Sequence, residues 1–128
     1  MTLRTAGVLA VATLLACGGS GPPPGPVSGE VAVRLTTTHS QVGAVMFRVI
    51  GQVDEVTAIG SVRVSTAAAG PTATRIIVSG ALTPGDVVRL RVPDVEQITA
   101  YVVVTEQVAS RDGFVLLDPG GAQLTVRR

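Results

Sequence analysis

The sequence predicts an all-β protein whose single domain is an antiparallel β-sandwich of about seven to nine strands. Three observations support this prediction. From Gly29 onward, apolar and polar residues alternate with a period of two, which is typical of strands with one buried face. Turn-forming residues interrupt the alternation every ~8–12 residues, as they do in sandwiches. No stretch of helical length combines a 3.6-residue period with helix caps.

The expected strands follow one another along the chain, and each is rich in β-branched residues that favour extended backbone. Their core-facing phase comprises Val31, Val33 and Leu35; Val45, Phe47 and Val49; Val62 and Val64; Ile76 and Val78; Val88, Leu90 and Val92; Val102 and Val104; Leu124 and Val126. Glycine, proline and aspartate predict the turns between them. These turns are expected at Gly51, Gly70-Pro71, residues 83–86, Pro93-Asp94, Asp112-Gly113 and residues 119–121.

One residue does not fit the alternation. Glu106 falls in phase with Val104 and Val108, so strict alternation would bury a carboxylate, which is costly. Either a β-bulge resets the phase near Thr105 or the strand leaves the core there. We expect a bulge.

The start of the chain has the composition of an export signal. Arg4 precedes an apolar run of about 11 residues, well short of the ~20 that span a bilayer as a helix. The run ends in Leu14-Leu15-Ala16-Cys17. This ending resembles a bacterial lipoprotein signal, which is cut before a cysteine that then becomes lipidated. The alternatives are an ordinary cleaved signal and a simple membrane anchor.

The resemblance implies that Leu14, Leu15 and Ala16 are recognised by the signal peptidase. It also implies that Cys17 carries two or three acyl chains, such as palmitate, which together hold a protein firmly to a membrane. Gly18, where an aspartate would favour the inner membrane, points to the outer membrane, on its periplasmic or surface side. We therefore expect a signal peptide over residues 1–16.

Residues 17–28 are mostly glycine, proline and serine, so after the lipidated cysteine we expect a flexible linker. At ~3.1 Å per residue in a polyproline conformation, this linker would hold a domain ~20–35 Å from the lipid surface. A ligand for a proline-recognition module is the alternative. The β-sandwich domain is then expected over residues 29–128.

Composition excludes several classes of function. A single cysteine permits neither an intramolecular disulfide nor a cysteine metal site. Because the net charge is only +1, electrostatics give no reason to expect nucleic acid as a partner. His39 is the one histidine, and no G-x-S-x-G motif supplies a nucleophile for it. We expect no enzyme activity and no cofactor.

After the export signal, the order of segments resembles cohesin-like sandwiches. Residues 42–49 with the acidic turn Asp54-Glu55 are similar to the early strands, residues 74–92 to the middle pair, and residues 101–109 and 122–126 to the last strands. The layout also resembles small envelope lipoproteins that carry a cohesin-like domain. The resemblance makes Asp112 and Asp118 candidate calcium ligands, although a D-x-D-x-D-G spacing is absent. Bonding to their own backbone is the alternative role for such turn aspartates.

Arginines lie on the outward phase of several strands, where they keep sheet faces soluble and discourage edge pairing. Arginine is also favoured at interfaces, so Arg34, Arg48, Arg89 and Arg91 form a candidate partner face. Sugar binding usually needs exposed aromatic rings. Phe47 shares the core phase, and Tyr101 is the ring expected to be exposed, so a stacking platform is hard to build.

These observations favour a lipid-anchored cell-envelope protein that acts as a non-catalytic interaction or structural module. Its expected partners are the membrane, through the lipid on Cys17, and another envelope protein. We expect a monomeric domain. A carbohydrate- or calcium-binding module of an envelope complex is the alternative, and a small hydrolase is the third possibility.

Overall fold

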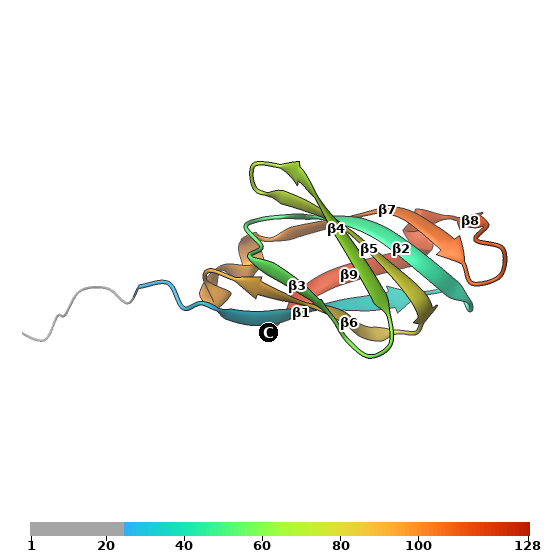
Figure 1. The fold of residues 1–128 in the computed structure, drawn as a ribbon, viewed down its shortest axis with the longest axis horizontal. Helices are drawn as coiled ribbons and strands as arrows, with labels where there is room; N and C mark the ends of the chain where they lie inside the picture. Colours follow the sequence, from blue (N-terminus) through green and yellow to red (C-terminus); the bar gives the residue numbers. More distant parts are fainter. Residues whose placement is uncertain (1–24) are drawn as a thin grey trace, which may run out of the picture.

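The computed structural model describes residues 25–128, which fold into a sandwich of two antiparallel β-sheets (Figure 1). Sheet A has the order β3-β6-β1-β9, and sheet B has the order β4-β5-β2-β7-β8. The strands of sheet A are β1 (Gly29–Thr37), β3 (Glu55–Ala58), β6 (Gly85–Val92) and β9 (Ala122–Arg127). Those of sheet B are β2 (Val42–Ile50), β4 (Arg63–Gly70), β5 (Ala73–Leu82), β7 (Val102–Ser110) and β8 (Leu116–Leu117). The predicted β-sandwich of seven to nine strands is confirmed, with nine strands in the described residues.

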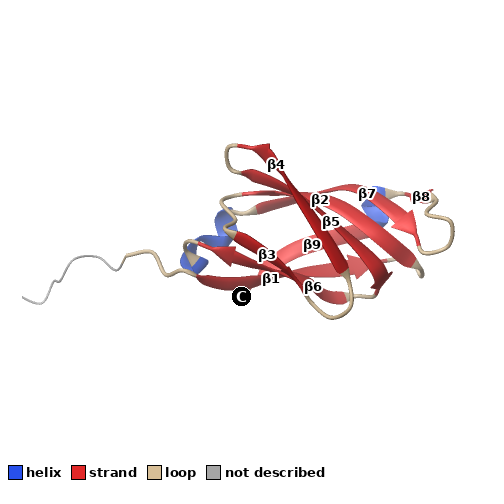
Figure 2. Cartoon of the chain, viewed as in Figure 1, coloured by secondary structure: helices blue, strands red, loops and turns tan. Residues whose placement is uncertain are grey.

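Helical structure in the described residues is limited to two short 3₁₀ segments, η1 (Val95–Ala100) and η2 (Pro119–Gly121) (Figure 2). Each begins at an aspartate whose side chain accepts a backbone N–H bond. Asp94 accepts from Glu96 at 3.0 Å, and Asp118 accepts from Gly120 at 3.1 Å. Both aspartates therefore act as caps, which satisfies N–H groups that a helix start leaves unpaired.

The core lies between the two sheets and follows the predicted alternation in β1, β2 and β6. Phe47 is the largest fully buried side chain, with 0% of its surface exposed. In register it lies between Ile76 of β5 and Thr105 of β7. Its fully buried aliphatic neighbours come from both sheets and include Val33, Leu35, Val45, Val49, Ile76, Val78, Val88, Leu90, Val92 and Val108.

Strand β7 contains the predicted bulge, but its phase before the bulge is the reverse of the expected one. Met46 pairs with Gln107 and Phe47 pairs with Thr105, so Glu106 is the extra residue of the bulge. Upstream of it, Val103 packs against the core, whereas Val102 is 51% exposed. The prediction that Val102 and Val104 face the core is therefore wrong. The bulge reverses the alternation of inward and outward residues along β7. Because β7 begins with three consecutive valines, the sequence does not indicate which of them face inward.

Two strands meet closely at Gly43, near the start of β2. A Cβ atom at this position would lie 2.6 Å from Cα of Arg111 and 2.7 Å from the carbonyl oxygen of Ser110. The pairing of β2 with both of its neighbours shifts between Val42 and Ala44, so Gly43 occupies an irregularity in the ladder. Only a residue without a side chain allows the backbone just after β7 to approach this closely.

The N-terminal side of the described chain is attached to η1. The N–H of Val27 donates to the Asp94 carboxylate at 3.3 Å, and the Val27 carbonyl accepts from the N–H of Val95 at 2.8 Å. The predicted recognition residues Leu14, Leu15 and Ala16 and the predicted lipidation site Cys17 lie outside the described residues. Within residues 25–128, no helix is long and apolar enough to cross a membrane.

Candidate functional site

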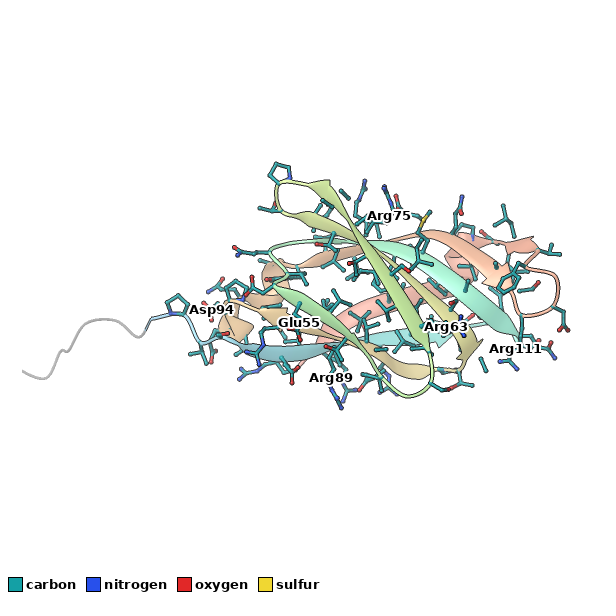
Figure 3. All side chains as sticks on the ribbon, in the orientation of Figure 1. Glu55, Arg63, Arg75, Arg89, Asp94 and Arg111 are labelled. Atoms are coloured by element: carbon teal, nitrogen blue, oxygen red, sulfur yellow. The ribbon has the colours of Figure 1, made fainter. Side chains whose placement is uncertain are left out.

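The four arginines of the candidate partner face do not lie on one surface. Arg34 on β1 and Arg89 and Arg91 on β6 belong to sheet A, whereas Arg48 on β2 belongs to sheet B. All four are on the outward phase of their strands, so sheet A and sheet B present them on opposite sides of the sandwich. Figure 3 shows this separation for Arg89 of sheet A and Arg75 of sheet B, which lie on opposite sides of the molecule.

The outer face of sheet A carries charges of both signs in alternating positions. Arg91 lies opposite Glu30 of β1 on one side and opposite Glu55 of β3 on the other. Arg34 lies opposite Asp86, whose carboxylate also lies 4.0 Å from the guanidinium of Arg127. Such an arrangement is largely self-compensating and keeps a sheet face soluble.

The outer face of sheet B is apolar around a shallow hollow. The hollow has a volume of about 120 Å³ and lies where β5, β2, β7 and β8 run side by side. We call it the sheet B hollow, and its lining residues are Ala44, Met46, Ile77, Gln107, Ala109 and Leu116. Ile77 is 42% exposed and Leu116 is 67% exposed. Contiguous exposed apolar side chains of this kind mark contact surfaces far better than scattered ones do.

Further exposed apolar side chains lie beyond the hollow toward both ends of the sheet. In the β7–β8 hairpin, Phe114 and Val115 precede Leu116 and are both exposed. Toward the other end of the sheet, Ile50 of β2 and Val102 of β7 lie directly opposite each other and are both exposed. Alternation alone placed Ile77 on the outward phase, but the gathering of these residues depends on strand order, which the sequence did not reveal.

An ion pair crosses the middle of this face. Arg75 of β5 donates from Nε and Nη2 to the two carboxylate oxygens of Glu106 on β7, at 2.7 and 3.2 Å. The hydrogen bond from Arg75 lowers the pKa of the Glu106 carboxyl; partial burial opposes this effect, and the charges of Arg75 and Arg48 add to it. Arg48 lies between them on β2, and its buried Nε has no hydrogen-bond partner among residues 25–128. The bulge therefore turns Glu106 outward, where arginine neutralises it.

The candidate calcium ligands do not come together with other acidic groups. Asp112 lies in the β7–β8 turn, where its carbonyl accepts from the Ser110 hydroxyl at 2.8 Å. The carboxylate of Asp118 caps η2, and the Asp118 carbonyl lies 2.9 Å from Nε2 of His39. Among the described residues, no three histidine, cysteine, aspartate or glutamate side chains form a group that could hold a metal ion.

The three aromatic rings are placed separately. Phe47 is buried as expected, and Phe114 is 62% exposed at the tip of the β7–β8 hairpin. Tyr101 was expected to be exposed, but it is half-buried and packs against the core. Its hydroxyl donates to the carbonyl of Gln52, and a Cβ at Gly51 would lie 2.6 Å from the ring. The residue before β7 turns inward because Gly51 leaves room for it.

Comparisons of the chain with protein-family models, curated proteins and solved structures found no match.

Proposed function

We propose that the protein is a lipid-anchored cell-envelope protein whose β-sandwich serves as a non-catalytic interaction or structural module. The observation that carries the proposal is the exposed apolar surface around the sheet B hollow, rimmed by Ile77 and Leu116. The outer face of sheet A, in contrast, carries charges of both signs that compensate one another. Removing the apolar side chains around the hollow from water favours association with a partner.

The partner proposed for this surface is another envelope protein with a complementary apolar contact. Interface cores are depleted of charge and enriched in large apolar residues, whereas polar residues surround them. The sheet B hollow fits this pattern, because none of its lining residues is charged and Ile77 lies on the same face of β5 as Arg75, which Glu106 neutralises. The arginines of sheet A would then keep the opposite face in solution.

Anchoring is the second part of the proposal and rests on the Leu14–Cys17 sequence. Replacing Cys17 by alanine is expected to move the protein from the membrane fraction to the soluble fraction after cell lysis. Retention of the Cys17→Ala protein in washed membranes would contradict lipid anchoring through this residue. Mass spectrometry of the natural chain is expected to find acyl chains on Cys17.

The contact surface is tested by capturing partners from the envelope with matched variants. Ile77→Asp and Leu116→Asp each place a charge on the rim of the hollow. Burial of one such side chain is worth ~1.5–3 kcal/mol, so each variant should bind the captured partner about 10- to 100-fold more weakly. Thr57→Asp, an exposed position on the outer face of sheet A, is the control and should bind normally. Equal binding by all three variants would refute this surface.

A further inference from the structure

The four sheet edges of the sandwich are protected to very different degrees. Strand β3 is only four residues long and begins at Glu55. Strand β8 has two residues. The edge strand β9 of sheet A is covered by β7 of sheet B. There the hydroxyl of Thr105 on β7 donates to the carbonyl of Ala122 on β9 at 3.2 Å. Strand β4, at the outer edge of sheet B, is longer than β3 and β8, and its one charge is Arg63 at the first residue.

Strand β4 is eight residues long and pairs with β5 on one side only. The pairing is regular from Arg63 to Ala68, so no bulge twists the edge away along this length. Between Val64 and Gly70 the strand has no charge and no proline, and residues 65–68 are all exposed. Natural edge strands are normally shortened, charged or covered, since an open row of N–H and C=O groups pairs readily with another strand.

The hairpin that contains β4 also extends past the rest of the sandwich. Its tip stands clear of the other strands at the top of Figure 1. Thr66 and Ala68 share the inward phase of Val64 and lie opposite Ile76 and Thr74, yet both are exposed. Sheet A ends in the short strand β3 and does not cover them. The side chains of residues 65–68 are therefore accessible on both faces of this hairpin.

We propose that β4 pairs antiparallel with β4 of a second copy of this chain, which joins the two five-stranded sheets into one continuous sheet. A two-fold axis normal to the sheet places Thr66 opposite Thr66 of the second copy, Ser65 opposite Ala67, and Val64 opposite Ala68. Cross-strand Thr–Thr pairs are favourable, and small residues let the backbones approach.

Charge favours an antiparallel pair over a parallel one. In the antiparallel register centred on Thr66, Arg63 lies opposite Ala69 of the second copy. A parallel register would bring the two Arg63 side chains together, and directly opposed like charges destabilise a strand pair. The monomeric domain expected from the sequence is the alternative to this dimer. The dimer does not depend on the sheet B hollow, so either proposal can fail alone.

Disulfide trapping tests the dimer in membranes of cells that express the full chain. Thr66→Cys places one thiol on each side of the two-fold axis, where cross-strand Cβ atoms approach to ~4.5–5.5 Å. The natural chain, whose one cysteine is Cys17, gives the background. Thr125→Cys, at an exposed position on β9, is the control. We expect at least about tenfold more reducible dimer from Thr66→Cys than from Thr125→Cys, because only the former pair is held at this distance.

A second variant distinguishes strand pairing from random collision. Ala68→Lys adds a charge at an exposed position that the dimer would place against Val64 of the second copy. Added to Thr66→Cys, it should abolish the disulfide-linked dimer, whereas Thr125→Lys in the same background should leave it intact. Equal trapping from Thr66→Cys and Thr125→Cys, or a dimer that persists with Ala68→Lys, would overturn the proposal. A Thr66→Cys disulfide to a different protein would overturn the second copy as the occupant.

Discussion

Truncation of Phe47 is the most direct test of the packing between the two sheets. The Phe47 ring is 0% exposed and lies between Ile76 and Thr105, so its removal leaves a cavity bounded by three strands of sheet B and by sheet A opposite. Loss of a fully buried phenylalanine costs about 3–5 kcal/mol. Because small domains are stable by only ~5–15 kcal/mol, Phe47→Ala should remove a large fraction of the free energy of unfolding.

The chain offers a matched control in its other phenylalanine. Phe114 is 62% exposed at a hairpin tip, so Phe114→Ala should change the free energy of unfolding by less than about 0.5 kcal/mol. Urea titrations followed by far-ultraviolet circular dichroism measure both variants. A slope of about 1–3 kcal/mol per molar urea converts the Phe47→Ala loss into a midpoint shift of at least ~1 M. Similar midpoints for the two variants would refute the assigned core.

Three further predictions concern single contacts. Gly43→Ala should destabilise the domain by about 1–3 kcal/mol in urea titrations, because the new methyl group meets the backbone beside Arg111; an unchanged midpoint would contradict that approach. Glu106→Gln should lower stability more at pH 7 than at pH 3: Arg75 holds the carboxyl pKa below its usual 4.5, so the stabilisation is fully present above that value and is lost as pH falls through the folded-state pKa. Equal effects at both pH values would refute the ion pair. The phenol of Tyr101 should ionise above pH 10 in the folded protein, because burial, and to a smaller extent the charges of nearby aspartates, raise its pKa. The stability that the neutral phenol contributes is therefore present below pH 10 and is lost as pH rises through the folded-state pKa. Absorbance at alkaline pH measures this, and a midpoint at or below 10 would contradict the half-buried ring.

Alternation predicted the fold class and most of the core because burial on one sheet face imposes a period of two. It succeeded best where the two faces differ, as in β6, where Arg89 and Arg91 alternate with buried valine and leucine. It failed in the first part of β7, where valines occupy both faces and the bulge at Glu106 reverses the phase. The anomalous position of Glu106 revealed the bulge but not its direction.

The candidate site could not be predicted because it depends on which strands are neighbours. Arg34 and Arg48 occupy equivalent outward positions on their strands, yet strand order places them on opposite sides of the molecule. The sheet B hollow combines Ile77 and Leu116, which are distant in sequence and belong to strands whose pairing the alternation does not specify. The exposed edge of β4 was hidden for the same reason.

Site-specific photo-crosslinking from the sheet B hollow tests the proposed function most directly. A photoreactive amino acid in place of Met46, which lines the hollow, would be compared in the native envelope with the same amino acid in place of Thr125 on sheet A. We predict a cross-link from position 46 to one envelope protein, lost when Leu116→Asp is added and absent from position 125. The same products from both positions, or none from position 46, would contradict an interaction module that uses this face.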